Sequence, residues 1–315
     1  MKRTYFNLNL LLPLVVLVTL ASAPDADAQR RRKTAAGTSV QAQAFTVRTE
    51  AGAIIWLDEV RRGVTDVSGK LTIMNVRAGR HTLRVRASGF KEMTLSLAAG
   101  RRGEINVKLT RTTDEAELMF QQAESAREKA RDDEARQAAA ASYRRALELR
   151  PRFPAARVGL ARVLLDLNDY KGALEQIDEA REVRPVYPEA SAVEGRILRE
   201  NADTNGAIEA FERAIREARG FQPEAHTGLA LALEDKGRNE EAVAEFRKAI
   251  AQLSDTEPVL YQLLGALYEK MENYKEAVAA YEKFLQLAPE SNLAPAIRSV
   301  LDQLRRQAAE QEAAS

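Results

Sequence analysis

Four prolines recur at almost equal intervals in the second half of the chain. The intervals are 34, 35 and 35 residues between Pro154, Pro188, Pro223 and Pro258. Four alanines keep the same spacing, at Ala173, Ala207, Ala242 and Ala277. A period in the mid-thirties indicates that one supersecondary unit is copied several times, and such copies stack into a solenoid. Because solenoids mostly hold other molecules, the pattern favours a binding protein over an enzyme.

Each repeat unit pairs two helices. In the clearest unit, one helix carries an apolar and aromatic face, a second helix follows it, and Pro289 ends the unit; the residues concerned are Tyr261, Leu264, Gly265, Tyr268, Ala277, Tyr281 and Phe284. This pattern closely resembles the tetratricopeptide repeat, which implies a superhelix of helix-turn-helix units. The expected boundaries are a degenerate unit at 114–153, units at 154–187, 188–222, 223–257 and 258–291, and a C-terminal capping helix at 292–311.

Small residues recur where the two helices of a unit face each other, and a large residue follows four positions after the second small one. The large residues are Ile177, Phe211, Phe246 and Tyr281. Small residues let helices approach closely, so each large side chain is expected to fill the gap to its neighbour.

Residues 44–111 have a different pattern, with short apolar–polar alternations separated by glycine-containing turns. Expected strands lie at 45–48, 54–57, 71–73, 81–85 and 105–109. Such spacing is typical of a small all-β sandwich. The fold class predicted from the sequence is therefore multidomain: a small all-β sandwich followed by an all-α superhelix.

The turn and strand positions of this β module carry a second resemblance. Gly52-Ala53 precedes Leu57-Asp58, and further turns follow at Gly63, Gly69, Ala78-Gly79 and Gly89-Phe90. The segment is similar to a PEGA domain, and equally to a carboxypeptidase regulatory-like domain. Both families are noncatalytic β-sandwiches found in many exported bacterial proteins, so the resemblance implies a fold rather than a ligand.

The N-terminus has the layout of a secretory signal peptide. Lys2 and Arg3 precede an apolar run from Leu8 to Leu20, and small residues follow at Ala26-Asp27-Ala28. We expect a signal peptide at 1–28 and a basic linker at 29–43, with the mature protein periplasmic or associated with the cell envelope. The alternative is an uncleaved N-terminal membrane anchor, although the run is shorter than the ~20 residues of a spanning helix.

The formal net charge of +1 conceals two oppositely charged parts. Residues 29–111 contain 17 Lys and Arg against 6 Asp and Glu, whereas residues 112–315 contain 28 against 38. Such asymmetry concerns partners and solubility rather than fold. On one strand of the β module, Arg80, Arg84 and Arg86 share a face, which predicts either a solvated surface or a basic docking face for an anionic partner.

The resemblance to tetratricopeptide repeats implies that the first helix of each unit lines a concave groove. Carried over by position, the candidate peptide-binding residues are Val158, Arg162, Leu165, Arg196, Arg199, Leu231, Glu234, Gln262 and Glu269. The alternative is that the arginines form ordinary surface ion pairs with neighbouring glutamates.

No motif in the chain predicts catalysis, a cofactor or a metal site. The chain has no cysteine and two histidines, and both histidines occupy positions expected for packed side chains. There is no phosphate-binding glycine loop and no nucleophile motif. We therefore expect no enzyme activity.

Three hypotheses for function remain open. In the first, an exported scaffold binds a protein or peptide through the solenoid and docks to the envelope through the β module. In the second, the β module binds cell wall or carbohydrate and the solenoid is a spacer. In the third, the opposite charges fold the chain back on itself. Nucleic acid is not an expected partner, and membrane association would come only through an uncleaved signal.

Overall fold

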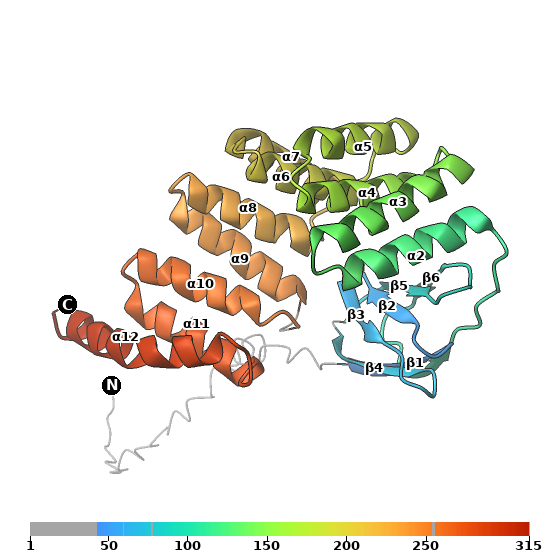
Figure 1. The fold of residues 1–315 in the computed structure, drawn as a ribbon. Helices are drawn as coiled ribbons and strands as arrows, with labels where there is room; N and C mark the ends of the chain where they lie inside the picture. The colour runs from blue at the N-terminus through green and yellow to red at the C-terminus, as the bar shows by residue number, and fades with distance from the viewer. Residues whose placement is uncertain (1–42, 59, 77, 254–255, 315) are drawn as a thin grey trace, which may run out of the picture. The chain divides into compact units, whose positions relative to one another are not determined.

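The computed structural model describes residues 43–58, 60–76, 78–253 and 256–314. The expected signal peptide and almost all of the basic linker lie outside these residues. The described chain consists of two β-sheets followed by eleven helices (Figure 1). The predicted fold class, a small β module followed by a helical repeat, is confirmed.

The β module consists of two sheets. Its strands are β1 (Gln43–Arg48), β2 (Ile54–Leu57), β3 (Val60–Val64), β4 (Lys70–Val76), β5 (His81–Arg86), β6 (Met93–Leu97) and β7 (Gly103–Asn106). One sheet has the order β4-β1-β7 and the other the order β3-β2-β5-β6. Only the β1–β7 pair is parallel among the described strand pairs. Strands β3 and β6 are additional to those expected from the sequence.

Alternating side chains of the strands form the core of the β module. Val47, Ile55, Leu57, Leu83 and Val85 are fully buried there. Because side chains alternate across a strand, one apolar face per sheet is enough to build this core.

One turn of the β module depends on glycine. Gly69 has φ +75°, and a Cβ at this position would lie 2.0 Å from the carbonyl oxygen of Thr49. The amide of Thr49 in turn donates to the carbonyl of Gly69 at 2.8 Å. A side chain at position 69 would therefore break the turn that joins β3 to β4.

The helical part forms antiparallel helix pairs in chain order. The helices are α2 (Glu115–Lys129), α3 (Asp133–Leu149), α4 (Pro154–Asp166), α5 (Tyr170–Val183), α6 (Pro188–Glu200), α7 (Thr204–Glu217), α8 (Pro223–Asp235), α9 (Asn239–Leu253), α10 (Val259–Lys270), α11 (Tyr274–Leu287) and α12 (Ala294–Ala314). Each helix packs against the next along the chain.

The periodic prolines begin the first helix of their units. Pro154, Pro188 and Pro223 are the first residues of α4, α6 and α8, and Pro258 directly precedes α10. The backbone N–H of the first residue of a helix has no acceptor within the helix. Proline at this position therefore loses no hydrogen bond, and its ring fixes a helical φ.

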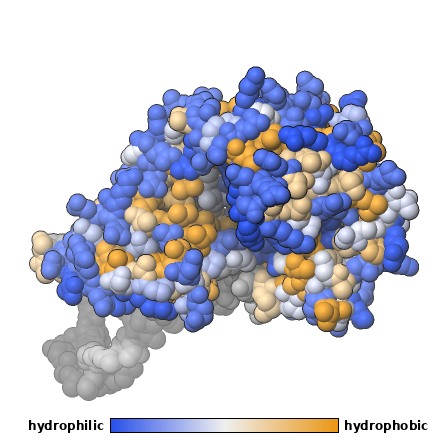
Figure 2. Space-filling view, in the orientation of Figure 1, coloured by the Kyte–Doolittle hydropathy of each residue, from blue (hydrophilic) through white to orange (hydrophobic). Residues whose placement is uncertain are grey.

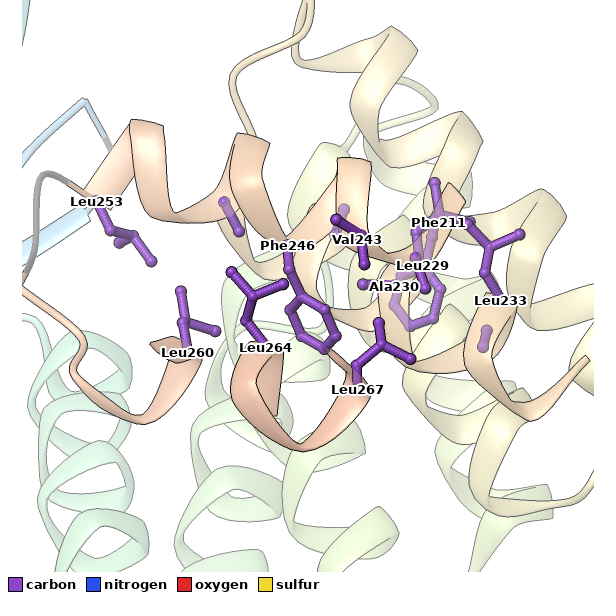
Figure 3. Packing of buried hydrophobic residues seen from close by; sticks show 14 of the residues in the cluster. Phe211, Leu229, Ala230, Leu233, Val243, Phe246, Leu253, Leu260, Leu264 and Leu267 are labelled. Atoms are coloured by element: carbon purple, nitrogen blue, oxygen red, sulfur yellow. The ribbon is translucent and has the colours of Figure 1, made fainter. Parts of the chain in front are cut away.

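Glycines in the first helices receive aromatic rings from the second helices. The ring of Phe211 packs between Gly195 of its own unit and Gly228 of the next, where added Cβ atoms would lie 2.7 and 2.2 Å from ring carbons. Gly265 receives Tyr281 in the same way. The large residues thus fill the space left by small ones, as expected from the sequence, and Phe211 joins two units at once. Figure 3 shows this packing continuing through Phe246 to Leu264 and Leu267.

Candidate functional site: the concave face and its pocket

We call the side of the solenoid formed by the first helix of each unit the concave face, after the groove expected from the sequence. Helix α4 contacts α6, and α6 contacts α8, so side chains two units apart can meet. Arg162 of α4 donates from Nη1 and Nη2 to the two carboxylate oxygens of Glu224 in α8, at 2.8 and 2.9 Å. Glu189 of α6 lies 3.5 Å from the same guanidinium. Arg162 therefore links three consecutive units, and its side chain is only 17% exposed.

This ion pair changes the acidity of Glu224. Burial by itself raises the pKa of the Glu224 carboxyl, but Arg162 and Arg196 outweigh it and lower that pKa to about 2. The carboxylate of Glu224 is therefore ionised at neutral pH.

The depressed pKa of Glu224 predicts an acid-sensitive link between units. Its stabilising contribution is fully present above the ordinary pKa of 4.5 and is lost as the pH falls towards 2. Glu224→Gln should lower the urea midpoint at pH 7 and flatten its decline between pH 4.5 and 2, measured by far-ultraviolet circular dichroism. An identical decline in wild type and variant would contradict this assignment.

Two further ion pairs continue along the concave face with a constant offset. Arg199 of α6 donates to Asp235 at the end of α8 at 2.7 Å, and Lys270 of α10 lies 3.3 Å from Glu234 of α8. Each pair joins residues 36 apart, one unit plus one residue. The charges predicted to meet a ligand therefore mostly meet one another.

The nine predicted groove residues fall into four groups in the structure. Val158 and Leu165 are buried in the core, and Arg162 and Glu234 form the inter-unit ion pairs. Gln262 is half-buried on α10, and Glu269 accepts a hydrogen bond from the hydroxyl of Tyr281 at 3.0 Å. The remaining three, Arg196, Arg199 and Leu231, line one pocket.

This pocket has a volume of about 530 Å³ and is bounded by several elements. Side chains of α6, α8, α9 and α10 form most of it, and Val60 and Arg61 of β3 complete it. Figure 2 shows apolar side chains gathered over α8, α9 and α10. We call this hollow the concave pocket.

The sequence did not indicate that β3 takes part. Val60 is 6% exposed and belongs to the same hydrophobic cluster as Leu229 and Leu260 of the solenoid. Two residues before it, Asp58 has φ +53°. The Asp58 carboxylate accepts from the backbone N–H of Thr82 at 2.8 Å and lies 2.6 Å from Nδ1 of His81, which fixes Asp58 against β5.

The predicted basic docking face is largely used inside the molecule. Arg80 is exposed, but the Arg84 side chain is 19% exposed and the Arg86 side chain 11%. The guanidinium groups of Arg84 and Arg86 lie 4.3 and 5.3 Å from the ring centroid of Trp56, where cation–π attraction holds them. Only Arg84 and Arg86 lie on β5, because Arg80 directly precedes the strand, and these two side chains are largely covered.

Arg86 also connects the β module to the first helix of the solenoid. Its Nη1 donates to Glu124 of α2 at 3.3 Å, and its guanidinium lies 4.9 Å from the ring centroid of Phe120. Gln121 adds two hydrogen bonds, accepting from the amide of Gly89 at 2.9 Å and donating to the carbonyl of Phe90 at 2.8 Å. The β module therefore covers the N-terminal end of the helical stack.

Both histidines have carboxylate partners. His81 lies beside Asp58, and Nδ1 of the buried His226 lies 2.6 Å from Glu245, while its Nε2 is 3.2 Å from the carbonyl of Gly220. Across the described residues, no group of three or more His, Asp and Glu side chains is arranged to hold a metal ion. None of the described helices combines the length with the apolar composition of a membrane span.

Comparison with known protein families identifies the helical part. Family models described as tetratricopeptide repeat match residues 130–197, 193–258 and 258–291, which together span more than half of the chain. The chain belongs to the tetratricopeptide-repeat proteins. No protein with a curated function matches the sequence, and none of the family models names the β module.

Solved structures of tetratricopeptide-repeat proteins resemble the fold. A thermophilic tetratricopeptide-repeat protein of Thermus thermophilus, TTC0263, is 22% identical, with a TM-score of 0.50, over 60% of this chain and 98% of its own. The pilF protein of Pseudomonas aeruginosa is 18% identical, with a TM-score of 0.52, over 62% and 87%. PilW, described as a type IV pilus biogenesis factor, is 17% identical, with a TM-score of 0.53, over 64% and 92%. The fold is thus one that supports protein–protein interaction.

Proposed function

We propose that this chain is an exported, noncatalytic scaffold whose solenoid binds a protein or peptide partner. The observation that carries the proposal is the concave pocket, where Arg196, Arg199 and Leu231 of the predicted groove come together. Most concave charges are already paired, so the pocket is the part of this face that remains open to a ligand.

The test of this proposal is affinity purification of the mature protein from its native envelope under mild conditions. A partner that co-purifies with wild type and is lost from Leu231→Asp supports it. Leu231 is only partly buried, so circular dichroism must first show that the variant keeps its helices. Recovery of the same partners by both proteins would contradict binding at the concave face.

Export is part of the same proposal and is supported by the N-terminal sequence. We expect cleavage after Ala28 and a mature protein in the periplasmic or cell-envelope fraction. Mass spectrometry of the purified mature N-terminus, with cell fractionation, measures both. A full-length N-terminus in the membrane fraction would favour the anchored alternative, and a cytoplasmic protein would contradict export.

For the β module we propose a PEGA-like or carboxypeptidase regulatory-like sandwich that docks to an anionic envelope polymer or a partner. Its two-sheet architecture supports the first part. Because Arg84 and Arg86 are held over the ring of Trp56, docking is assigned to the exposed Arg80, which directly precedes β5. Arg80→Glu should reduce salt-sensitive retention on envelope material, whereas unchanged retention would exclude this surface.

The carbohydrate-binding alternative receives no support from Trp56. This is the only tryptophan of the chain, and the Arg84 and Arg86 guanidinium groups lie over its ring. An aromatic platform for a sugar needs an accessible ring face, so this residue is poorly placed for such a role.

A further inference from the structure

We propose that the concave pocket is a composite site, in which β3 and the solenoid together bind an uncharged, extended peptide segment through an aliphatic side chain. This inference rests on the proposed function and adds two elements to it: the contribution of the β module, and the chemistry of the ligand.

Strand β3 is a fixed wall of the pocket. The Gln121 hydrogen bonds and the Arg86–Glu124 ion pair attach the β module to α2. Arg61, which lines the pocket, donates to Glu128 of α2 at 3.0 Å. The surface that a ligand meets therefore includes the β3 side chains from the start, without a prior rearrangement.

The charged side chains that line the pocket balance one another in number. Three arginines, Arg61, Arg196 and Arg199, stand against three glutamates, Glu200, Glu224 and Glu257. The arginines are all engaged: Arg61 with Glu128, Arg196 with Glu224 at 3.6 Å, and Arg199 with Asp235 and Glu200. An anionic ligand would have to displace one of these ion pairs, whereas an uncharged segment would not.

Aliphatic surface remains accessible in the pocket. Val259 is 43% exposed and lines the pocket together with the partly buried Leu231. Burial of an aliphatic side chain against such surface is favourable in proportion to the apolar area removed from water. Val60 already shows the fit, because this side chain from a β-strand packs in the same hydrophobic cluster. A neutral aliphatic segment in extended conformation continues the interface that Val60 begins.

The experiment uses the full mature chain and a phage-displayed library of random twelve-residue peptides. We expect selection to enrich peptides with aliphatic side chains and few charges. Synthetic copies of the enriched peptides should lose at least tenfold in affinity on Val60→Asp and on Val259→Asp. The matched control is Val186→Asp, because Val186 is 63% exposed and does not line the pocket.

Binding should change little between 50 and 500 mM salt, because no net charge is neutralised. Trp56 fluorescence shows whether the Val60→Asp variant keeps the β module in place. If the β module is displaced in that variant, Val60→Ala is used in its place. Enrichment of strongly charged peptides would overturn the ligand chemistry. Binding that survives Val259→Asp would overturn the pocket, and tighter binding to a folded Val60 variant would make β3 an obstacle rather than a wall. Failure to enrich any peptide would overturn the proposed peptide binding itself.

Discussion

Replacing Gly228 by alanine is expected to lower the free energy of unfolding by about 2 kcal/mol. The added Cβ would lie 2.2 Å from the ring of Phe211, a side chain that is fully buried and also rests on Gly195. In an exposed helix the same substitution would stabilise by up to about 1 kcal/mol, so the sign of the effect distinguishes packing from helix propensity. Urea unfolding followed by circular dichroism measures it.

A second substitution provides the control. Phe211→Leu removes part of the ring, so the double variant with Gly228→Ala should lose less stability than the two single variants predict by addition. Strict additivity, or a stabilising effect of Gly228→Ala alone, would show that the ring does not occupy this space.

Replacing Glu124 by glutamine is expected to weaken the attachment of the β module to α2 by about 2 kcal/mol. Burial raises the pKa of the Glu124 carboxyl, but Arg127 and Arg86 lower it more strongly, so the group is ionised in the folded protein. Its loss leaves Arg86, only 11% exposed, with Glu92 as its remaining carboxylate partner at 2.7 Å among the described ion pairs. The midpoint of the urea-unfolding transition followed by Trp56 fluorescence measures this loss of stability.

The matched control for this prediction is Glu128→Gln. Glu128 pairs with Arg61, whose side chain is 46% exposed, and a pair of this kind contributes less than about 1 kcal/mol. The Trp56 transition should therefore shift strongly for Glu124→Gln and little for Glu128→Gln. Equal shifts would mean that burial of the Arg86 pair does not hold the β module.

The period of the repeat was readable because the packing between units is local. Proline at a helix start, and small residues opposite a large one, leave a mark every 34 or 35 residues. Within the β module, alternation located the strands that form most of the core. Strand β6 was missed although Met93 to Leu97 also alternates, whereas β3 carries Arg61, Arg62 and Gly63 and has little apolar pattern.

The candidate site was less predictable because it depends on contacts far apart in the sequence. Its position within the repeat unit placed Arg162 on the concave face. Nothing in the nearby sequence indicated that Glu224, 62 residues later, would accept from both terminal nitrogens of the Arg162 guanidinium. The partner of Arg86 was equally hard to predict. The sequence showed Arg86 as one of several arginines near β5, but Glu124 lies 38 residues away on α2. Val60 carries no pattern at all, and its role follows only from the attachment of the β module.

The central claim is that the β module and the solenoid form one unit with a shared pocket, and the distance between them tests it most directly. The chain has no cysteine, so spin labels can be attached at Val67→Cys and Val186→Cys alone. Both positions are well exposed, at 98% and 63%. Pulsed electron paramagnetic resonance should give one narrow distance distribution, broadened by Glu124→Gln. A broad distribution in the otherwise unchanged chain would mean that the β module is a free tether, and would contradict the account.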